Sequence, residues 1–182
     1  MRILVLNGIP GDKKYESYEQ AIEKSIIENK KHEIEYFRLR DMDIKHCTGC
    51  WACWVKTPGL CSIKDDYEQV FSRIPHADEV LYISPVILGY ESSILKKCKD
   101  RSIGTAIPYI TFFKGEQHHV QRYKKNPEIR VLLLTDEDTN QEDIDLISST
   151  YFRNALNSRK KEVSRFTAID SVGGVEDVFN NL

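Results

Sequence analysis

The sequence predicts an α/β protein with a doubly wound sheet of five parallel strands between two layers of helices. Short apolar runs, typical of buried strands, alternate along the chain with segments whose apolar residues recur at helical spacing. The 182 residues, 41% of them hydrophobic and 30% charged, suit one ordinary globular domain. We therefore expect a single domain over residues 1–182, with an insertion at about residues 104–127.

The first strand and helix follow from a short apolar run and a helical stripe. Residues 3–6 form a continuous apolar run, as expected of a strand buried on both faces. Ile22 and Ile26 then share one face of a helix that ends near Asn29. Residues 33–39 alternate as the second strand.

The second helix and third strand follow the same logic. Asp65 or Asp66 is placed to cap a helix, and apolar residues recur at i, i+3, i+4 and i+7 over residues 67–74. Pro75 ends this helix, and residues 79–84 form the third strand. Residues 85–89 are predicted as a turn.

The third helix carries Ile94, Leu95 and Cys98 on its inward face, so Cys98 is interpreted as a core residue. Asp100 and Arg101 are expected to end this helix and to pair locally.

The alternation fails at residues 104–127, which we predict to be an insertion over the ends of the sheet. It holds a short strand at residues 109–113 and then a polar stretch at residues 114–123. Loops of this length in a compact domain are often functional.

The last three elements restore the alternation. Residues 129–134 form the fourth strand and residues 142–157 a long helix. Residues 163–169 are predicted as an edge strand, because Ser164 and Arg165 are polar. Ligands of a doubly wound sheet bind beyond the carboxyl ends of its strands. Here these ends lead into the loops at residues 7–17, 40–64, 84–91 and 135–141.

Composition and charge exclude several classes of partner. A net charge of -2, with both signs mixed, gives no electrostatic reason to expect nucleic acid. No apolar run is long enough for a membrane span. The first apolar run meets Gly8 and Pro10 at once and lacks a cleavage site, so we interpret it as a strand and not a signal peptide. We expect a cytoplasmic protein.

Four cysteines form the most informative motif: Cys47, Cys50, Cys53 and Cys61. Their thiols can converge only if the backbone turns tightly, and Gly49 and Gly59 allow such turns. In a reducing compartment such a cluster favours redox chemistry or metal binding over a disulfide scaffold.

Three segments resemble the flavodoxin-like NAD(P)H-dependent FMN reductases, on the branch that includes iron-sulfur flavoproteins. These are Asn7-Gly8 after the first strand, the cysteine loop up to Lys64-Asp65-Asp66, and the run from Ser84-Pro85-Val86 to Asp100-Arg101. The resemblance covers roughly residues 1–135. It implies a flavodoxin-like three-layer αβα domain that binds FMN through three loops and uses NAD(P)H as co-substrate.

The resemblance also implies the residues that contact FMN: Gly8, Pro10, Lys13, Ser17, Pro85, Val86, Ile87, Leu88, Gly89 and Tyr90. Two loops depart from the family pattern. In the first loop, Asp12 and Glu16 would repel a phosphate. In the third, residues 135–138 are typical of a helix cap and place carboxylates where a reduced flavin would be disfavoured.

The cysteines leave three alternatives open. The first alternative, which the resemblance raises, is an iron-sulfur cluster held by the four thiolates, although family members with a similar loop need not carry one. A redox-active or reactive thiol pair is the second alternative. The third is simple packing of reduced thiols with Trp51 and Trp54. Zinc is less apt, because structural zinc sites more often use two separated cysteine pairs.

A second polar group lies in the insertion: Glu116, His118, His119, Arg122 and Tyr123. Adjacent histidines point in different directions on most backbones, so they are a weak metal signal. We expect these residues to order the insertion or face a partner subunit, with a role near the flavin as the alternative.

The predicted function is therefore FMN-dependent transfer of electrons from NAD(P)H to a small acceptor such as a quinone, a flavin or an electron carrier. One alternative is an electron-transfer protein of the iron-sulfur flavoprotein type. The other is a flavodoxin-fold binding module that has lost FMN. The resemblance implies a homodimer or higher homo-oligomer, and no catalytic side chain is required because the flavin carries the chemistry.

Overall fold

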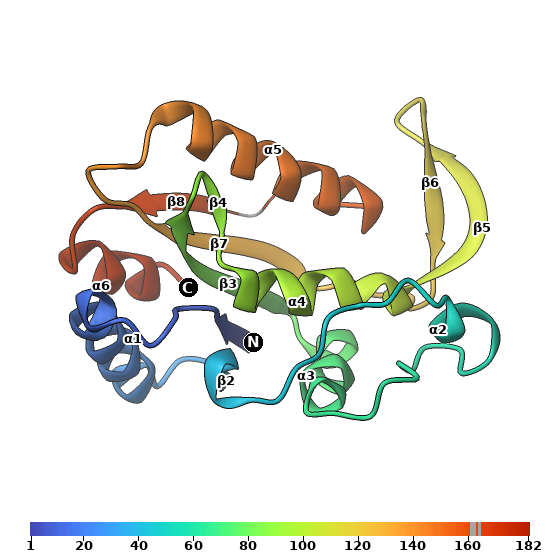
Figure 1. Ribbon diagram of the computed structural model, residues 1–182, viewed down its shortest axis with the longest axis horizontal. Coiled ribbons are helices and arrows are strands. Elements are labelled where there is room, and N and C mark those ends of the chain that lie inside the picture. Colours follow the sequence, from blue (N-terminus) through green and yellow to red (C-terminus); the bar gives the residue numbers. More distant parts are fainter. Residues whose placement is uncertain (161–162, 164) are drawn as a thin grey trace.

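The computed structural model describes residues 1–160, 163 and 165–182. Its central sheet has the strand order β2-β1-β3-β7-β8, and every neighbouring pair on this path is parallel (Figure 1). The strands are β1 (Arg2–Asn7), β2 (Glu33–Arg38), β3 (Glu79–Ile87), β7 (Glu128–Leu134) and β8 (Arg165–Ile169). This is the strand order of flavodoxin-like sheets, so the predicted fold class is confirmed.

Helices cover both faces of the sheet, and the alternation of side chains along the strands explains why. On β1, Ile3 and Val5 pack into the core under α1 (Glu16–Glu28) and α6 (Gly173–Asn180). Leu4 and Leu6 point the other way. They pack into the second core, under α3 (Tyr67–Arg73), α4 (Ser93–Arg101) and α5 (Gln141–Asn157).

Most predicted elements are present within a few residues. Strand β8 pairs only with β7 on this path, which confirms it as an edge strand, although Ser164 lies outside the described residues. Asp65 accepts a hydrogen bond from the Tyr67 amide (3.2 Å), as expected of a residue that caps α3. Cys98 is buried in the core. The sequence patterns do not predict α6.

The turn predicted at residues 85–89 is wrong in extent. Strand β3 continues to Ile87 and pairs with the short antiparallel strand β4 (Tyr90–Glu91). Only Leu88 (φ 50°) and Gly89 (φ 76°) form the turn. The apolar residues of this run extend the strand because they remain buried up to Val86.

The insertion forms a small sheet of its own. Strands β5 (Ala106–Phe113) and β6 (Glu116–Gln121) pair as an antiparallel hairpin that projects from the body of the molecule (Figure 1). The polar stretch predicted as a loop is therefore partly a strand. The turn between the strands uses Lys114 and Gly115, both with positive φ, as expected of a tight hairpin.

No helix in the described part of the chain is long and apolar enough to cross a membrane.

Candidate functional site

The cysteine loop extends from the end of β2 to the far end of α4. It begins after β2 at the carboxyl edge of the sheet and runs along α4 to the C-terminal end of that helix (Figure 1). There the short helix α2 (Ala52–Val55) and three residues with positive φ, Gly49 (64°), Trp51 (57°) and Gly59 (80°), turn the backbone back on itself. The loop thus carries its thiols away from the carboxyl edge, where we expected them.

All four cysteines line one small hollow of about 70 Å³, as the spacing predicts. The rest of its wall includes Trp51, Ile63, Ile103 and Arg101. None of the four cysteines forms a disulfide. Among the described residues, no group of three or more His, Cys, Asp or Glu side chains converges on a point that a single metal ion could occupy.

The thiols differ in their electrostatic environment. Hydrogen bonding from Ser62, with help from the Ala52 amide and Thr48, lowers the pKa of Cys50 to about 7. Its sulfur lies 3.4 Å from the Ser62 hydroxyl. Burial raises the pKa of Cys53, and the nearby Cys61 thiolate raises it further. The loop therefore holds one thiol that ionises readily and another that resists ionisation.

Arg101 is the buried cation of this hollow, and its side chain is 0% exposed. It donates to Asp65 Oδ2 (2.5 Å) and to the carbonyls of Lys45 (3.2 Å) and Ile63 (3.3 Å). Its guanidinium also stacks on Tyr67, 4.4 Å from the ring centroid. These contacts span 36 residues between Asp65 and Arg101, so the expected local pairing of Arg101 is wrong.

Asp65 and Arg101 each stabilise the charged form of the other. Burial disfavours the charged guanidinium, but hydrogen bonding to the side chains of Asp65 and Cys61 outweighs this effect and raises the pKa of Arg101. Burial likewise opposes the Asp65 carboxylate, yet the hydrogen bond from Arg101 lowers its pKa. The Nε atom of Arg101 has no hydrogen-bond partner among the described residues. The sequence held one signal for this pair, since Asp65 and Arg101 both lie in segments that carry the family resemblance.

The insertion docks onto the cysteine loop through Arg122. Its guanidinium donates to the carbonyls of Gly104 (2.8 Å), Cys53 (3.3 Å) and Ala106 (3.4 Å). His119 packs on Trp54, with ring centroids 4.8 Å apart. The insertion therefore supports the loop that carries the thiols.

His118 belongs to a different contact. It is buried, and its Nδ1 lies 2.8 Å from the Asn157 side-chain oxygen at the end of α5. Glu116 lies 3.5 Å from its Nε2 and pairs with Arg153 of α5. The two histidines thus face different elements, and their contacts match the predicted ordering of the insertion.

The first loop brings together few of the residues predicted to hold a phosphate. Gly8 is buried, and its carbonyl accepts a hydrogen bond from Ser92 Oγ (2.6 Å), which ties the first loop to the start of α4. Pro10 is half-buried, whereas Lys13 and Ser17 are exposed.

The second loop, residues 85–90 at the end of β3, is followed directly by a buried ion pair. Glu91 lies 2.8 Å from Lys99 and accepts a hydrogen bond from the Tyr151 hydroxyl (2.6 Å). Burial lowers the pKa of Lys99, whose ammonium also stands 3.7 Å from the centroid of the Tyr151 ring. Of the residues predicted to contact a flavin here, Pro85 and Val86 are buried in β3, Tyr90 is half-buried, and Ile87 and Leu88 are exposed, Leu88 fully.

The third loop does not cap α5 as predicted. Asn140 caps that helix instead, in a reciprocal pair of hydrogen bonds with Asp143. Asp136 is exposed and pairs with Lys14 of the first loop (3.2 Å).

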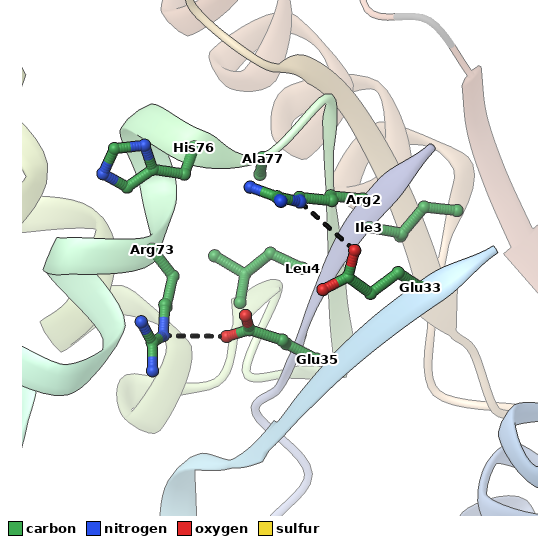
Figure 2. Close-up of a pocket in the computed structure, with 8 residues that line it drawn as sticks. All are labelled: Arg2, Ile3, Leu4, Glu33, Glu35, Arg73, His76 and Ala77. Carbon is green, nitrogen blue, oxygen red and sulfur yellow. Dashed lines mark hydrogen bonds and ion pairs between the residues drawn. The ribbon is translucent and has the colours of Figure 1, made fainter.

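A wide hollow of about 380 Å³ lies elsewhere, at the amino ends of β1 and β2 (Figure 2). Its charged groups pair with one another, Arg2 with Glu33 (3.2 Å) and Arg73 with Glu35 (2.9 Å). Ligands of this fold bind at the opposite edge of the sheet. We therefore place the candidate site at the three loops and at the cysteine hollow.

Over part of its length, the chain is similar in sequence to proteins named iron-sulfur flavoproteins. It is 33% identical over 102 residues to one from Archaeoglobus fulgidus, covering 56% of this chain and 49% of that protein. It is 37% identical over 70 residues to one from Methanocaldococcus jannaschii, covering 38% of this chain and 35% of that protein. The match therefore spans about half the length of these relatives or less. No protein-family model matches the chain.

Solved structures extend the likeness to the whole fold. The NAD(P)H:quinone oxidoreductase of Methanothermobacter marburgensis matches with a TM-score of 0.62 at 16% identity, covering 100% of this chain and 95% of that one. An FMN-dependent NADH-azoreductase of Bacillus anthracis matches with a TM-score of 0.57 at 15% identity, with the same coverage of 100% and 95%. The chain thus has the fold of these flavodoxin-like reductases and, over part of its length, is similar in sequence to proteins named iron-sulfur flavoproteins.

Proposed function

We propose that this chain is a flavin-dependent oxidoreductase of the iron-sulfur flavoprotein type, which takes electrons from NAD(P)H and passes them to a small acceptor. One observation carries the proposal: Cys47, Cys50, Cys53 and Cys61 line a single hollow. The names of the similar proteins support the same chemistry.

The donor set of the hollow is of the kind that holds iron-sulfur clusters. In a four-iron cluster each thiolate binds a different iron, so the four sulfurs stand around the cluster and not around one point. A zinc ion instead needs four ligand atoms within about 2.3 Å of one centre. The four cysteines line one hollow, and four thiolates are the usual donor set of a four-iron cluster.

The surrounding residues suit a charged redox group. A cluster held there would supply one-electron exchange. Arg101 offsets the negative charge of the thiolates, and Asp65 holds its guanidinium in place. Trp51 and Ile103 make the neighbouring wall apolar. Arg122 holds the Cys53 carbonyl, so that the loop is supported from the opposite side.

The second loop supports the flavin part of the proposal. Leu88 and Gly89 turn the backbone outward at the end of β3, where this fold binds its ligands. A flavin held by this loop would supply the chemistry of hydride and electron transfer. The phosphate of FMN does not fit the first loop as it is folded. The second loop and the cysteine hollow lie at opposite ends of α4, nine residues or about 14 Å of helix apart.

Anaerobic purification tests the proposal, with iron, sulfide and released flavin measured on the same sample. We expect about four irons and four sulfides per chain and broad visible absorbance. Cys53→Ser and Cys61→Ser should each lose more than about half of the iron, because each removes one ligand. The control is Cys98→Ala, which removes a buried thiol outside the hollow and should leave the iron unchanged.

Two outcomes would contradict parts of the proposal. Flavin without iron, even after anaerobic reconstitution with iron and sulfide, would leave a reductase that works without a cluster. A folded, colourless chain that binds neither iron nor flavin would favour the second candidate function, a flavodoxin-fold binding module that has lost FMN. The poor fit of the first loop to a phosphate is the observation that favours this candidate.

Location and assembly remain predictions of the same proposal. A homodimer is supported by three large apolar side chains that β5 exposes, Tyr109 (71%), Ile110 (53%) and Phe112 (71%). Light scattering of the purified protein would measure the oligomeric state. A monomer at micromolar concentration would contradict the prediction. A cytoplasmic location is expected from the cysteine content.

A further inference from the structure

Three backbone amides at the end of the first loop, those of Lys14, Tyr15 and Glu16, are hydrogen-bonded within the loop. The Lys14 amide donates to Asp12 Oδ1 (3.1 Å), and the Tyr15 amide donates to the Asp12 carbonyl (3.1 Å). The Glu16 amide donates to the Lys13 carbonyl. In a phosphate cradle such amides at a helix start would point at the anion. Here Asp12 accepts the hydrogen bonds of the Lys14 and Tyr15 amides in place of an anion.

The amides closer to β1 are also occupied. The Gly8 amide donates to the Ile83 carbonyl (2.8 Å), and the Ile9 amide donates to Asn7 Oδ1 (2.9 Å). Pro10 has no N–H group. A ligand phosphate would therefore have to displace existing hydrogen bonds to gain these donors.

The cations around the loop are largely committed to carboxylates. Lys14 pairs with Asp136 (3.2 Å). Arg40, which packs beside Gly11, pairs with Glu19. Only the exposed Lys13 has no carboxylate partner among the described ion pairs of this loop.

The net charge around the loop also opposes a phosphate. Asp12 lies at the centre of the loop, Glu16 follows on the first turn of α1, and Asp136 faces them from the third loop. A phosphate ester carries about 1.5 to 2 negative charges at neutral pH. The terminal hydroxyl of an unphosphorylated ribityl chain, in contrast, can donate a hydrogen bond to a carboxylate.

We propose that the Asp12 carboxylate takes the place of the ligand phosphate, so that this chain selects a flavin without a terminal phosphate, riboflavin, over FMN. The inference rests on the proposed function in assuming that the second loop binds a flavin ring. It names Asp12 as the specificity-determining residue.

Fluorescence titrations of riboflavin and FMN with the full chain test the inference. The wild-type Kd for riboflavin should be equal to or lower than that for FMN. Asp12→Asn keeps an oxygen that can accept from the Lys14 amide but removes the charge. It should tighten FMN binding about tenfold, equivalent to about 1.4 kcal/mol, and leave riboflavin binding within about twofold.

The matched control is Glu28→Gln, which changes net charge equally at the far end of α1 and should shift neither Kd by more than about twofold. Asp12→Ser serves as a second variant, and thermal unfolding followed by circular dichroism confirms that each variant folds.

Three results would overturn the inference. If the wild-type chain binds FMN at least about tenfold tighter than riboflavin, the inference is wrong, but the proposed function is strengthened. An unchanged ratio of affinities in both Asp12 variants overturns the role of Asp12. Failure of the wild type to bind riboflavin overturns the inference. Failure to bind either flavin also removes the flavin part of the proposed function, whereas iron analysis tests the cluster part separately.

Discussion

The cysteine loop and the first loop differ in how many of their polar groups are free to bind a ligand. The cysteine loop is held by groups from elsewhere, because Arg101 and Arg122 bind its backbone carbonyls. Its four thiols are thereby left to face one hollow. The first loop is held by its own Asp12, which accepts hydrogen bonds from the Lys14 and Tyr15 amides. A loop can bind a ligand only through polar groups that are not already hydrogen-bonded within the protein.

The largest expected effect tests the support of the cysteine loop. Arg101→Met leaves the buried Asp65 carboxylate without its cation, so we expect the free energy of unfolding to fall by about 3 to 5 kcal/mol. Denaturation in urea at pH 7 measures it. As a control, Asp100→Asn breaks an exposed pair with Lys96 and should cost less than about 1 kcal/mol. Equal losses in the two variants would show that the pair does not support the loop.

The same pair predicts a pH dependence. The pKa of Asp65 is lowered in the folded protein, so its stabilising contribution is fully present above the unfolded-state value of 3.8. It is lost as the pH falls through the lowered folded-state pKa. The difference in unfolding free energy between wild type and Asp65→Asn should therefore shrink below about pH 4. A difference that stays constant from pH 7 to pH 3 would contradict this assignment.

The next effect tests the packing of the first loop. A Cβ atom at Gly8 would lie 2.6 Å from Leu95 Cβ, so Gly8→Ala should destabilise the protein by about 1 to 3 kcal/mol. Gly11→Ala is the control in the same loop, because its nearest neighbour would be Arg40 Cδ at 3.8 Å, an ordinary contact. Urea denaturation compares the two variants. Similar stabilities would mean that the first loop is not clamped against α4.

A smaller effect is expected on the reactivity of the individual cysteine thiols. With a pKa of about 7, Cys50 should react with iodoacetamide at neutral pH in metal-free protein, at a rate that rises with pH as the thiolate forms. Ser62→Ala should raise this pKa and slow the reaction at pH 7 several-fold. Burial raises the pKa of Cys98 to about 12, so it should stay unmodified in the folded protein. Mass spectrometry of digested protein identifies the alkylated cysteines, and equal labelling of Cys50 and Cys98 would refute the prediction.

The smallest effect is expected at the surface contact between the first and third loops. Lys14→Gln removes an exposed pair with Asp136 and should lower the free energy of unfolding by less than about 1 kcal/mol. Thermal unfolding at low and high salt measures it. A larger loss would mean that this contact, and not Asp12, organises the first loop.

Local patterns predicted much of the fold because each strand and helix here is encoded by its own neighbours in sequence. The apolar run in β1 and the helical stripe in α1 are both buried as expected. Gly49 and Gly59 likewise make the tight turns that the cysteine spacing predicted, because both adopt positive φ, and the four cysteines line one hollow. The polar β6 escaped prediction, since a strand of a two-stranded hairpin carries little apolar alternation.

What the sequence by itself determined is the class of fold, the run of elements and the chemistry of four thiols in one loop. Only the tertiary structure decided that Asp65 meets Arg101, that the thiols lie at the far end of α4, and that Asp12 accepts a hydrogen bond from the Lys14 amide of its own loop. The reason is physical. Periodicity and turn residues act between neighbours in the chain, whereas a buried charge finds its partner only when distant segments pack and exclude water.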